Sequence, residues 1–479
     1  MSIRAALLHA YLEKYGSYVI GLVSTVVISR LLSPADVGAF AVGMALVGIV
    51  AVLRELGIST YVVQERELTV NRIRAAFTIT VGIGFVLALL VAALAVPVAS
   101  FYGDDRLQEI LWILAFGFAI TPLGSVSQSL LTRALRFGVL AWIRLTHALV
   151  MGVVGAWLAW RGLGPQSLAW ATATAAVTNA AISYWTHPHP VWPIAKREDL
   201  SRVFSIGVPT ALVAIVDDLI NTIPDLIVGR LQGLAAAGLL SRAKGLSQSA
   251  QQLIVRGAGP VFLSVYSDIK REGGRVESLY VKASACVCAV GWTLLAVLAV
   301  LAQPVVQLLY GPQWIDVVPL LRALCAAAAA LLLTSGSHIL LLAHDGARDA
   351  LHAKLWALPW YLACAVIGSV ISLEALAYAY VIASIAASGL MARALRRRVG
   401  IGIKAQLLPL QSSTLPAIGA GLACLPIAFW YAHSKAPTWA ALTIGLAAAA
   451  IGGAMGLAAR DSPLRAEVLR WWRTRAAIA

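Results

Sequence analysis

Long apolar runs, each about as long as a membrane-spanning helix, recur along the whole chain. A helix needs about 20 apolar residues to cross a hydrocarbon core that is roughly 30 Å thick. Because lipid offers no partner to backbone N–H and C=O groups, spanning segments are expected to be helices. The pattern therefore predicts an all-α integral membrane protein with about fourteen transmembrane helices, at 10–30, 37–60, 75–100, 107–131, 139–160, 166–186, 203–228, 234–262, 280–303, 317–342, 352–371, 375–393, 412–432 and 437–458.

The composition supports this interpretation. Of the 479 residues, 60% are hydrophobic and 12% are charged, whereas soluble domains contain about 25% charged residues. The connections between the runs are short, so no large soluble domain is expected. The formal net charge of +15 does not indicate nucleic-acid binding here, because basic residues near span ends set membrane topology.

The distribution of lysine and arginine predicts the orientation. With the N-terminus in the cytoplasm, 27 of the 37 basic residues fall on the cytoplasmic side. The outer side receives five of them, namely Arg30, Arg106, Arg161, Arg230 and Lys435. This bias predicts an even number of spans in a bacterial inner membrane, with both termini cytoplasmic.

The chain also repeats itself. Residues 30–38 close the first predicted span, and residues 230–238 close the seventh with Arg, Leu, Ala and Gly in register. A second echo places Phe101-Tyr102-Gly103 and Leu309-Tyr310-Gly311 at the outer ends of the third and ninth spans. Both units start from the cytoplasm, so the repeat is parallel.

The repeat predicts two pseudo-symmetric six-helix lobes followed by two extra helices. The proline-rich start of the linker and the basic residues after the twelfth span mark the boundaries. The predicted parts are an N-terminal six-helix lobe over 1–186, a cytoplasmic linker over 187–202, a C-terminal six-helix lobe over 203–395, a basic cytoplasmic loop over 396–411, two transmembrane helices over 412–458 and a cytoplasmic tail over 459–479.

Ionisable residues inside the predicted spans are the candidate functional groups. A charge in mid-bilayer costs roughly 2.5–3.5 kcal/mol even on the lenient insertion scale, so such residues must face protein or a polar cavity. In the eighth span, five residues are spaced three or four apart and so lie on one face of a helix. They are Arg242, Gly245, Ser249, Gln252 and Arg256, and Lys244 widens this polar face. The remaining basic residues inside spans are Lys14 and Arg322.

The seventh span carries the matching acids and amide, namely Asp217, Asp218, Asn221 and Asp225. Together the stripes predict a polar cavity between the two lobes, lined by spans one, seven and eight. A structural interpretation stays open, in which Asp218 or Asp225 pairs with Arg242 or Lys244 and pins neighbouring helices.

Three polar features elsewhere are predicted to be structural. His147 and Asn179 are expected to form interhelical hydrogen bonds. Arg54 and its neighbour Glu55 stand at a predicted cytoplasmic span end, where the arginine is expected to extend toward the membrane surface.

Motifs of catalysis are absent from the sequence. It has no Walker A loop, no H-E-x-x-H, no G-x-S-x-G and no His/Cys metal cluster. The five cysteines lie in apolar runs and are interpreted as small core residues. We therefore expect no catalytic residue, no metal site, no nucleic-acid partner and no enzyme activity, and no cofactor beyond a coupling Na⁺ or H⁺.

Three segments carry a resemblance to a known family. They are Glu13-Lys14-Tyr15-Gly16, the stretch from Ser29 to Gly38, which contains Arg-Leu-Leu-Ser-Pro-x-Asp-x-Gly, and Arg54-Glu55-Leu56-Gly57-Ile58-Ser59. The chain resembles the oligosaccharide flippases of the multidrug/oligosaccharidyl-lipid/polysaccharide exporter superfamily. The likeness is to the polysaccharide transporter branch, which moves undecaprenyl-pyrophosphate-linked repeat units.

The resemblance implies a V-shaped pair of six-helix bundles that alternate between inward-open and outward-open states. A cationic lumen would attract the pyrophosphate while the polyprenyl tail stays in lipid. The lumen candidates are Lys14, Arg242, Lys244, Gln252, Arg256 and Arg322, and the candidates for cation coupling or charge balance are Asp217, Asp218, Asn221 and Asp225. Expected partners are lipid-linked oligosaccharide and membrane lipid, with a polysaccharide polymerase and chain-length proteins as further candidates.

Three alternatives remain open from the sequence. A cation-coupled multidrug exporter of the same superfamily would favour an acidic lumen. Here the polar faces of spans one, seven and eight carry more basic than acidic residues. A lipid II flippase shares the superfamily fold. An integral-membrane polysaccharide polymerase or ligase usually has a sizeable outer loop, and every predicted outer loop is short.

Overall fold

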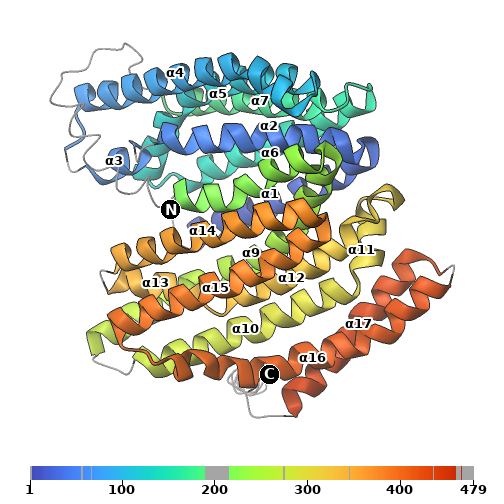
Figure 1. Ribbon diagram of the computed structural model, residues 1–479. Coiled ribbons are helices and arrows are strands. Elements are labelled where there is room, and N and C mark those ends of the chain that lie inside the picture. Colours follow the sequence, from blue (N-terminus) through green and yellow to red (C-terminus); the bar gives the residue numbers. More distant parts are fainter. Residues whose placement is uncertain are drawn as a thin grey trace. The chain divides into compact units, whose positions relative to one another are not determined.

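The computed structural model describes residues 3–55, 58–65, 67–188, 215–272, 276–344, 346–434, 436–459 and 465. All regular secondary structure within these ranges is helical (Figure 1). The chain folds as two compact units, Met1–Gly238 and Leu239–Ala479. The predicted linker at 187–202 and the start of the seventh span lie almost entirely outside the described residues.

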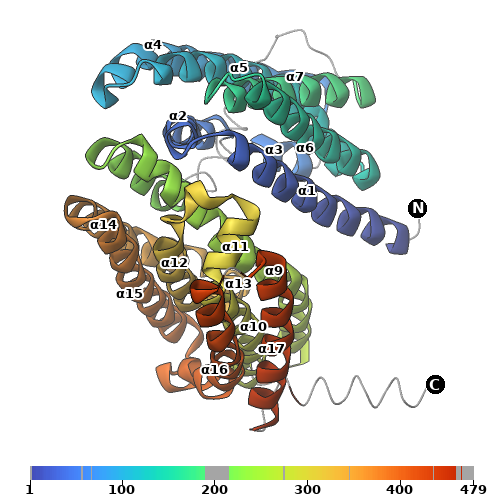
Figure 2. The same ribbon diagram turned by 90° about the vertical axis from the view of Figure 1, so that its right-hand side faces the viewer.

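The first unit contains seven labelled helices, a further helix over residues 215–231 and the first turn of α9. The labelled helices are α1 (Ile3–Leu31), α2 (Pro34–Glu55), α3 (Ile58–Gln64), α4 (Val70–Tyr102), α5 (Arg106–Arg133), α6 (Phe137–Trp160) and α7 (Gln166–Thr186). Helix α5 packs against both α4 and α7, and α6 packs against α1 and α7 (Figures 1 and 2).

The second unit contains the rest of α9 and the helices that follow it. Their bounds are α9 (Leu234–Glu272), α10 (Val276–Val300), α11 (Ala302–Leu309), the 3₁₀ turn η1 (Pro312–Trp314), α12 (Val317–Leu332), α13 (Ser335–Ala343), α14 (Ala347–Ile371), α15 (Leu373–Val399), α16 (Ile403–His433) and α17 (Thr438–Ala458). Helix α16 packs along both α10 and α17, as Figure 2 shows. A core cluster of Val297, Leu301, Ala420, Cys424 and Ala449 joins these three helices.

The fold class predicted from the apolar runs is confirmed. Among the described residues, nine helices are long and apolar enough to cross a membrane, or ten if α5, which bends by 42° at Pro122, is counted as one span. A shorter apolar helix covers Gly16–Leu31. The chain is a multi-pass α-helical membrane protein.

Two predicted spans are each divided between two labelled helices. The span expected at 37–60 divides into α2 and α3, whereas α12 and α13 together form the single candidate span Val317–Leu341 within the one expected at 317–342. The loop expected at 396–411 is mostly helical, because α15 continues to Val399 and α16 begins at Ile403. Three arginines in the last turn of α15 favour this extension, since cations stabilise a helix C-terminus.

The internal repeat appears as a backbone contact between equivalent residues. Gly38 in the first turn of α2 and Gly238 in the first turn of α9 are 200 residues apart and pack against each other. A Cβ on Gly38 would lie 1.6 Å from the Leu234 carbonyl oxygen, and one on Gly238 would lie 2.0 Å from the Pro34 carbonyl oxygen. The two helix starts therefore approach more closely than any side chain at either position permits.

Candidate functional site

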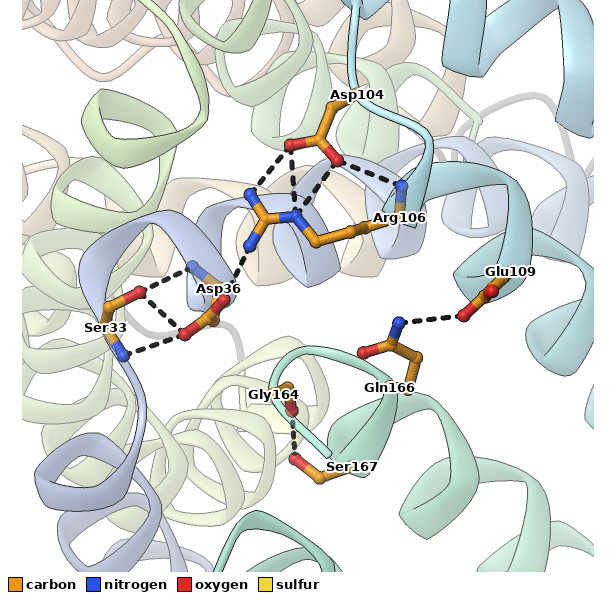
Figure 3. Close-up of polar contacts among 8 residues, drawn as sticks. All are labelled: Ser33, Asp36, Asp104, Arg106, Glu109, Gly164, Gln166 and Ser167. Atoms are coloured by element: carbon orange, nitrogen blue, oxygen red, sulfur yellow. Dashed lines mark hydrogen bonds and ion pairs between the residues drawn. The ribbon is translucent and has the colours of Figure 1, made fainter. Parts of the chain in front are cut away.

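The Ser-Pro-x-Asp part of the signature segment forms a capping box at the start of α2. The Ser33 hydroxyl oxygen accepts a hydrogen bond from the Asp36 backbone N–H at 3.2 Å. In return, the Asp36 carboxylate accepts bonds from the Ser33 N–H at 3.2 Å and hydroxyl at 2.7 Å (Figure 3). Pro34 stands at the first helical position, where its missing N–H costs nothing.

Asp36 also joins an ion-pair network between helix ends. Arg106, at the start of α5, donates from Nη1 to Asp36 Oδ1 at 2.8 Å and from Nη2 to Asp104 Oδ2 at 2.7 Å (Figure 3). The hydrogen bond from Arg106 lowers the pKa of the Asp104 carboxyl. Nearby, Gln166 Nε2 donates to Glu109 Oε2 at 2.9 Å and links the starts of α7 and α5. This part of the signature therefore holds together helix ends at the predicted outer side of the first unit.

On α9, the first predicted lumen residue is held against aromatic rings. The Arg242 guanidinium carbon lies 5.7 Å from the ring centroids of both Tyr310 and Trp314. Trp314 is fully buried and Tyr310 is 2% exposed. Arg242 Nε is buried and has no hydrogen-bond partner among the described residues. Arg242 therefore packs beside the repeated segment Leu309-Tyr310-Gly311, and cation–π contacts stabilise its charge.

The other predicted lumen cations have different surroundings. Lys244 is buried, whereas Gln252 is exposed on the same helix. The side chains of Lys14 and Arg256 lie outside the described atoms. Arg322 is exposed on α12, and its Nε donates to the Ala299 carbonyl oxygen at 3.3 Å. That bond caps the C-terminal end of α10, and the predicted place of Arg322 in the lumen stays a prediction.

The acids and amide of the helix over 215–231 face partners inside the first unit. Asn221 Nδ2 donates to the Asp217 carbonyl oxygen at 2.7 Å. Thr222 Oγ1 donates to Asp218 Oδ2 at 3.5 Å. Asp225 is half-buried on the same helix. The structure thus brings Asp218 and Thr222 together, while the predicted cavity between the two lobes stays a prediction.

A polar pocket that the sequence analysis did not predict lies within the first unit. Its volume is about 510 Å³. Residues of α2 to α7 line it, and ten of the fifteen are polar. The polar lining residues are Arg54, Ser59, Thr80, Thr121, Ser125, Gln128, Ser129, Thr132, Arg144 and Asn179, and the apolar ones are Ile58, Val62, Val63, Val126 and Leu140.

Arg54 enters this pocket from the end of α2. Its guanidinium carbon lies 4.5 Å from the ring centroid of Phe118, which stands about halfway along α5. Arg54 ends the candidate membrane span Pro34–Arg54, so it stands at a span end as expected. Its extension toward the membrane surface stays a prediction.

Hydrogen bonds hold the amide groups of the pocket in place. Gln128 Nε2 donates to Asn179 Oδ1 and, at 3.1 Å, to Ser183 Oγ. His147 Nδ1 lies 3.2 Å from the Ala175 carbonyl oxygen. The predicted interhelical roles of His147 and Asn179 are therefore confirmed, and Asn179 also lines the pocket. The missed signal was the spacing of polar residues on one face of α5, at 121, 125, 128, 129 and 132.

Comparison with known proteins identifies the family. The family model described as "Polysaccharide biosynthesis protein" matches residues 27–319. The chain is 24% identical over 318 residues to the succinoglycan biosynthesis transport protein ExoT of Rhizobium meliloti (strain 1021), a match that covers 65% of this chain and 63% of that protein. It is 22% identical over 317 residues to the lipopolysaccharide biosynthesis protein WzxC of Escherichia coli (strain K12), covering 64% of this chain and 63% of that protein. The chain thus spans just under two thirds of the length of the curated relatives that it matches.

A solved structure shares the fold. The lipid II flippase MurJ, in an inward closed conformation, superposes with a TM-score of 0.75 at 14% identity, covering 94% of this chain and 98% of that one. The family match confirms the resemblance to polysaccharide proteins that the signature segments indicated, and the structural match shows the shared fold. Because the family model matches more than half of the chain, we conclude that the protein belongs to the family of polysaccharide biosynthesis proteins.

Proposed function

We propose that the protein is a flippase for undecaprenyl-pyrophosphate-linked oligosaccharide repeat units. It would move them from the cytoplasmic to the periplasmic leaflet of a bacterial inner membrane during synthesis of an exopolysaccharide, O-antigen or capsule. The family match over residues 27–319 carries this proposal. Support comes from relatives named for succinoglycan transport and lipopolysaccharide biosynthesis, and from the fold shared with a lipid II flippase.

The physical argument for a lipid-linked, anionic cargo begins with cations inside a membrane protein. A buried cation in a lipid-embedded bundle costs several kcal/mol unless protein groups or a ligand offset it. Lys244 is 8% exposed on α9, and Arg54 is half-buried and contacts Phe118. Basic side chains inside the protein suit a substrate that brings negative charge, such as a pyrophosphate, whose oxygens match the guanidinium fork.

The mechanism we propose is alternating access without covalent chemistry. The headgroup and sugars would pass through a polar, cationic path while the polyprenyl tail stays in lipid. A polysaccharide polymerase and chain-length proteins would take the delivered repeat units on the periplasmic side. We further propose that Na⁺ or H⁺ drives the cycle, with Asp218 as the first candidate because Thr222 already holds its carboxylate in place.

A cell-based experiment tests the proposed function. Cells that lack this protein are expected to accumulate lipid-linked repeat units that a periplasmic glycan label cannot reach. If the protein were a polymerase or ligase, the units would accumulate in the periplasmic leaflet and the label would reach them. If it were a drug exporter, the units would not accumulate, and the cells would retain cationic dye.

A further inference from the structure

The predicted cytoplasmic end of the second unit carries a strongly basic surface. It is formed by residues 344–354 and 392–411, which together contain seven lysine and arginine residues and two acids. Helix α14 begins in the first of these segments, and α15 ends and α16 begins in the second (Figure 1). We call the two segments together the basic surface. Its charge suits a partner that is itself anionic.

Two hydrogen bonds and an ion pair fix the helix ends that carry the basic surface. Arg398 Nε, in the last turn of α15, donates at 3.1 Å to the carbonyl oxygen of His344, which follows α13. The same Nε lies 3.8 Å from Asp349 Oδ2 in the first turn of α14. Gln406 Nε2, near the start of α16, donates to the Ala392 carbonyl oxygen of α15 at 3.0 Å. The fold therefore holds four helix ends together in one place.

Most cations of the basic surface are exposed and not used within the protein. Five of them make no side-chain hydrogen bond or ion pair with any residue that the structure describes: Arg348, Arg393, Arg396, Arg397 and Lys404. Membrane topology requires basic residues on one side of the bilayer. It does not require them to gather on a surface whose helix ends are fixed to one another, so this grouping favours a binding role.

The first two turns of α16 present an apolar face beside these cations. Ile403, Leu407 and Leu408 are between 43% and 48% exposed, and Lys404 lies on the same side of the helix. The buried residues of these turns lie on the opposite side, namely Ala405, Gln406 and Pro409. An exposed face that combines aliphatic side chains with a lysine is typical of a helix segment at a membrane surface.

Helix length places this part of the protein at the level of the lipid headgroups. Helix α16 has 31 residues, about 46 Å at 1.5 Å per residue, whereas the hydrocarbon core is roughly 30 Å thick. The span predicted at 412–432 is long enough to cross that core, so residues 403–411 extend beyond it. The last turn of α15, with Arg396 and Arg397, likewise extends beyond the span predicted at 375–393.

A ridge on α14 continues from the basic surface toward the hydrocarbon core. Arg348, His352, Trp356 and Trp360 follow one another at a spacing of four residues, and all four are exposed. The two indoles lie about 12 and 18 Å from Arg348 along the helix axis. Tryptophan favours the layer between the headgroups and the acyl chains. The ridge therefore presents a cation at one end and apolar rings below it, as an anionic phospholipid requires.

We infer that the basic surface binds anionic phospholipid headgroups of the leaflet that it faces, through its five exposed cations. Lysine and arginine near a membrane surface attract anionic lipid. The aliphatic face of α16 and the indoles of α14 add apolar contacts to the same molecule, which a small soluble anion could not make. This inference does not rest on the proposed function, because it involves no step of transport.

The test measures lipid binding to the full chain in a neutral detergent by native mass spectrometry. The probes are phosphatidylglycerol, phosphatidylcholine and glycerol 3-phosphate. The main variant is Arg396→Gln/Arg397→Gln, and Arg396→Lys/Arg397→Lys keeps the charge. The matched control is Arg136→Gln/Arg161→Gln, which removes two exposed cations at the ends of α6, in the first unit. Lys404→Gln on α16 tests the same surface from a second helix if the double glutamine variant folds poorly.

The parent is expected to bind phosphatidylglycerol about tenfold or more tightly than phosphatidylcholine. Each cation near an anionic headgroup contributes a factor of about five, so the double glutamine variant should bind phosphatidylglycerol about tenfold to thirtyfold more weakly and Lys404→Gln about fivefold more weakly. The lysine variant and the control should stay close to the parent, and added salt should weaken the parent's binding.

Three results would overturn the inference. The first is equal binding of the two lipids by the parent. The second is a loss in the control as large as in the double glutamine variant, because net charge alone would then explain the binding. The third is glycerol 3-phosphate binding as tight as that of phosphatidylglycerol, which would assign the basic surface to a soluble anion instead of a lipid.

Discussion

Replacing Gly238 by alanine tests whether the repeat is held together by direct backbone contact. The new Cβ would lie 2.0 Å from the Pro34 carbonyl oxygen and 3.0 Å from the Gly38 backbone nitrogen. An ordinary contact begins near 3.4 Å, so the start of α2 must recede by about 1.4 Å. Both partners are backbone atoms of helix ends and cannot rotate away, so we expect an overpacking cost of about 1–3 kcal/mol.

The matched control is Gly245→Ala on the same helix. No described atom lies within 4 Å of a Cβ at that position. Both substitutions gain about 1 kcal/mol of helix propensity, so the difference between the two variants isolates the packing cost. Gly38→Ala, whose Cβ would lie 1.6 Å from the Leu234 carbonyl oxygen, is expected to be the most damaging of the three.

The assay is thermal unfolding of the purified protein in detergent, followed by tryptophan fluorescence. We expect the apparent unfolding midpoint to be highest for Gly245→Ala and lowest for Gly38→Ala. The midpoints of Gly238→Ala and Gly38→Ala should lie a few degrees below that of Gly245→Ala. Equal midpoints for Gly238→Ala and Gly245→Ala would refute the reasoning, because they would show that the helix starts separate without cost.

Three further predictions concern the ion pairs and cation–π contacts. Arg106→Ala should lower stability by about 1 kcal/mol at neutral pH. Because the hydrogen bond from Arg106 lowers the pKa of Asp104, the parent's advantage is present above about pH 4 and should shrink as the pH falls through the lowered pKa; a difference that does not shrink at all under acid would contradict this role. A double-mutant cycle of Arg242→Met and Tyr310→Leu should give a coupling energy of about 0.5–2 kcal/mol by chemical denaturation, and additive effects would show that the cation–π contact contributes nothing. Arg322→Ala removes the bond to the Ala299 carbonyl and should cost less than about 1 kcal/mol without changing transport; a selective loss of transport at normal stability would restore Arg322 to the lumen.

The span pattern could be predicted because length and hydrophobicity alone decide whether a segment crosses lipid. Apart from short breaks, such as the one between α12 and α13, the described residues of each predicted run lie in helices. The breaks within runs could not be predicted in the same way. The charged pair Arg54-Glu55 ends α2, and Gly57 follows it, but apolar residues resume at once, so a search for long apolar runs joined α2 and α3 into one span. That ending places the Arg54 guanidinium beside Phe118 of α5, a contact that the sequence does not show.

For the candidate site, the sequence predicted which helix carries each residue but not what surrounds it. Helical spacing correctly placed Arg242 and Lys244 on α9, but it could not show which groups cover them. Tyr310 and Trp314, about 70 residues away in sequence, lie against the Arg242 guanidinium. The capping role of Arg322 likewise depends on the neighbouring end of α10. The polar stripe on α5 was visible in the sequence, yet it contains no charge and so was not selected by a search for buried ionisable residues.

The most direct test of the proposed function is leaflet exchange of the cargo itself. Purified protein is reconstituted in liposomes that carry a fluorescent undecaprenyl-pyrophosphate oligosaccharide, and the label in the outer leaflet is quenched from outside. The flippase account predicts that inner-leaflet label becomes accessible with the parent protein, and more slowly with Arg54→Gln and with a Lys244→Gln variant. Liposomes that keep their inner-leaflet label protected, while the same protein moves a cationic dye under a Na⁺ or H⁺ gradient, would contradict it and identify an exporter of cations instead.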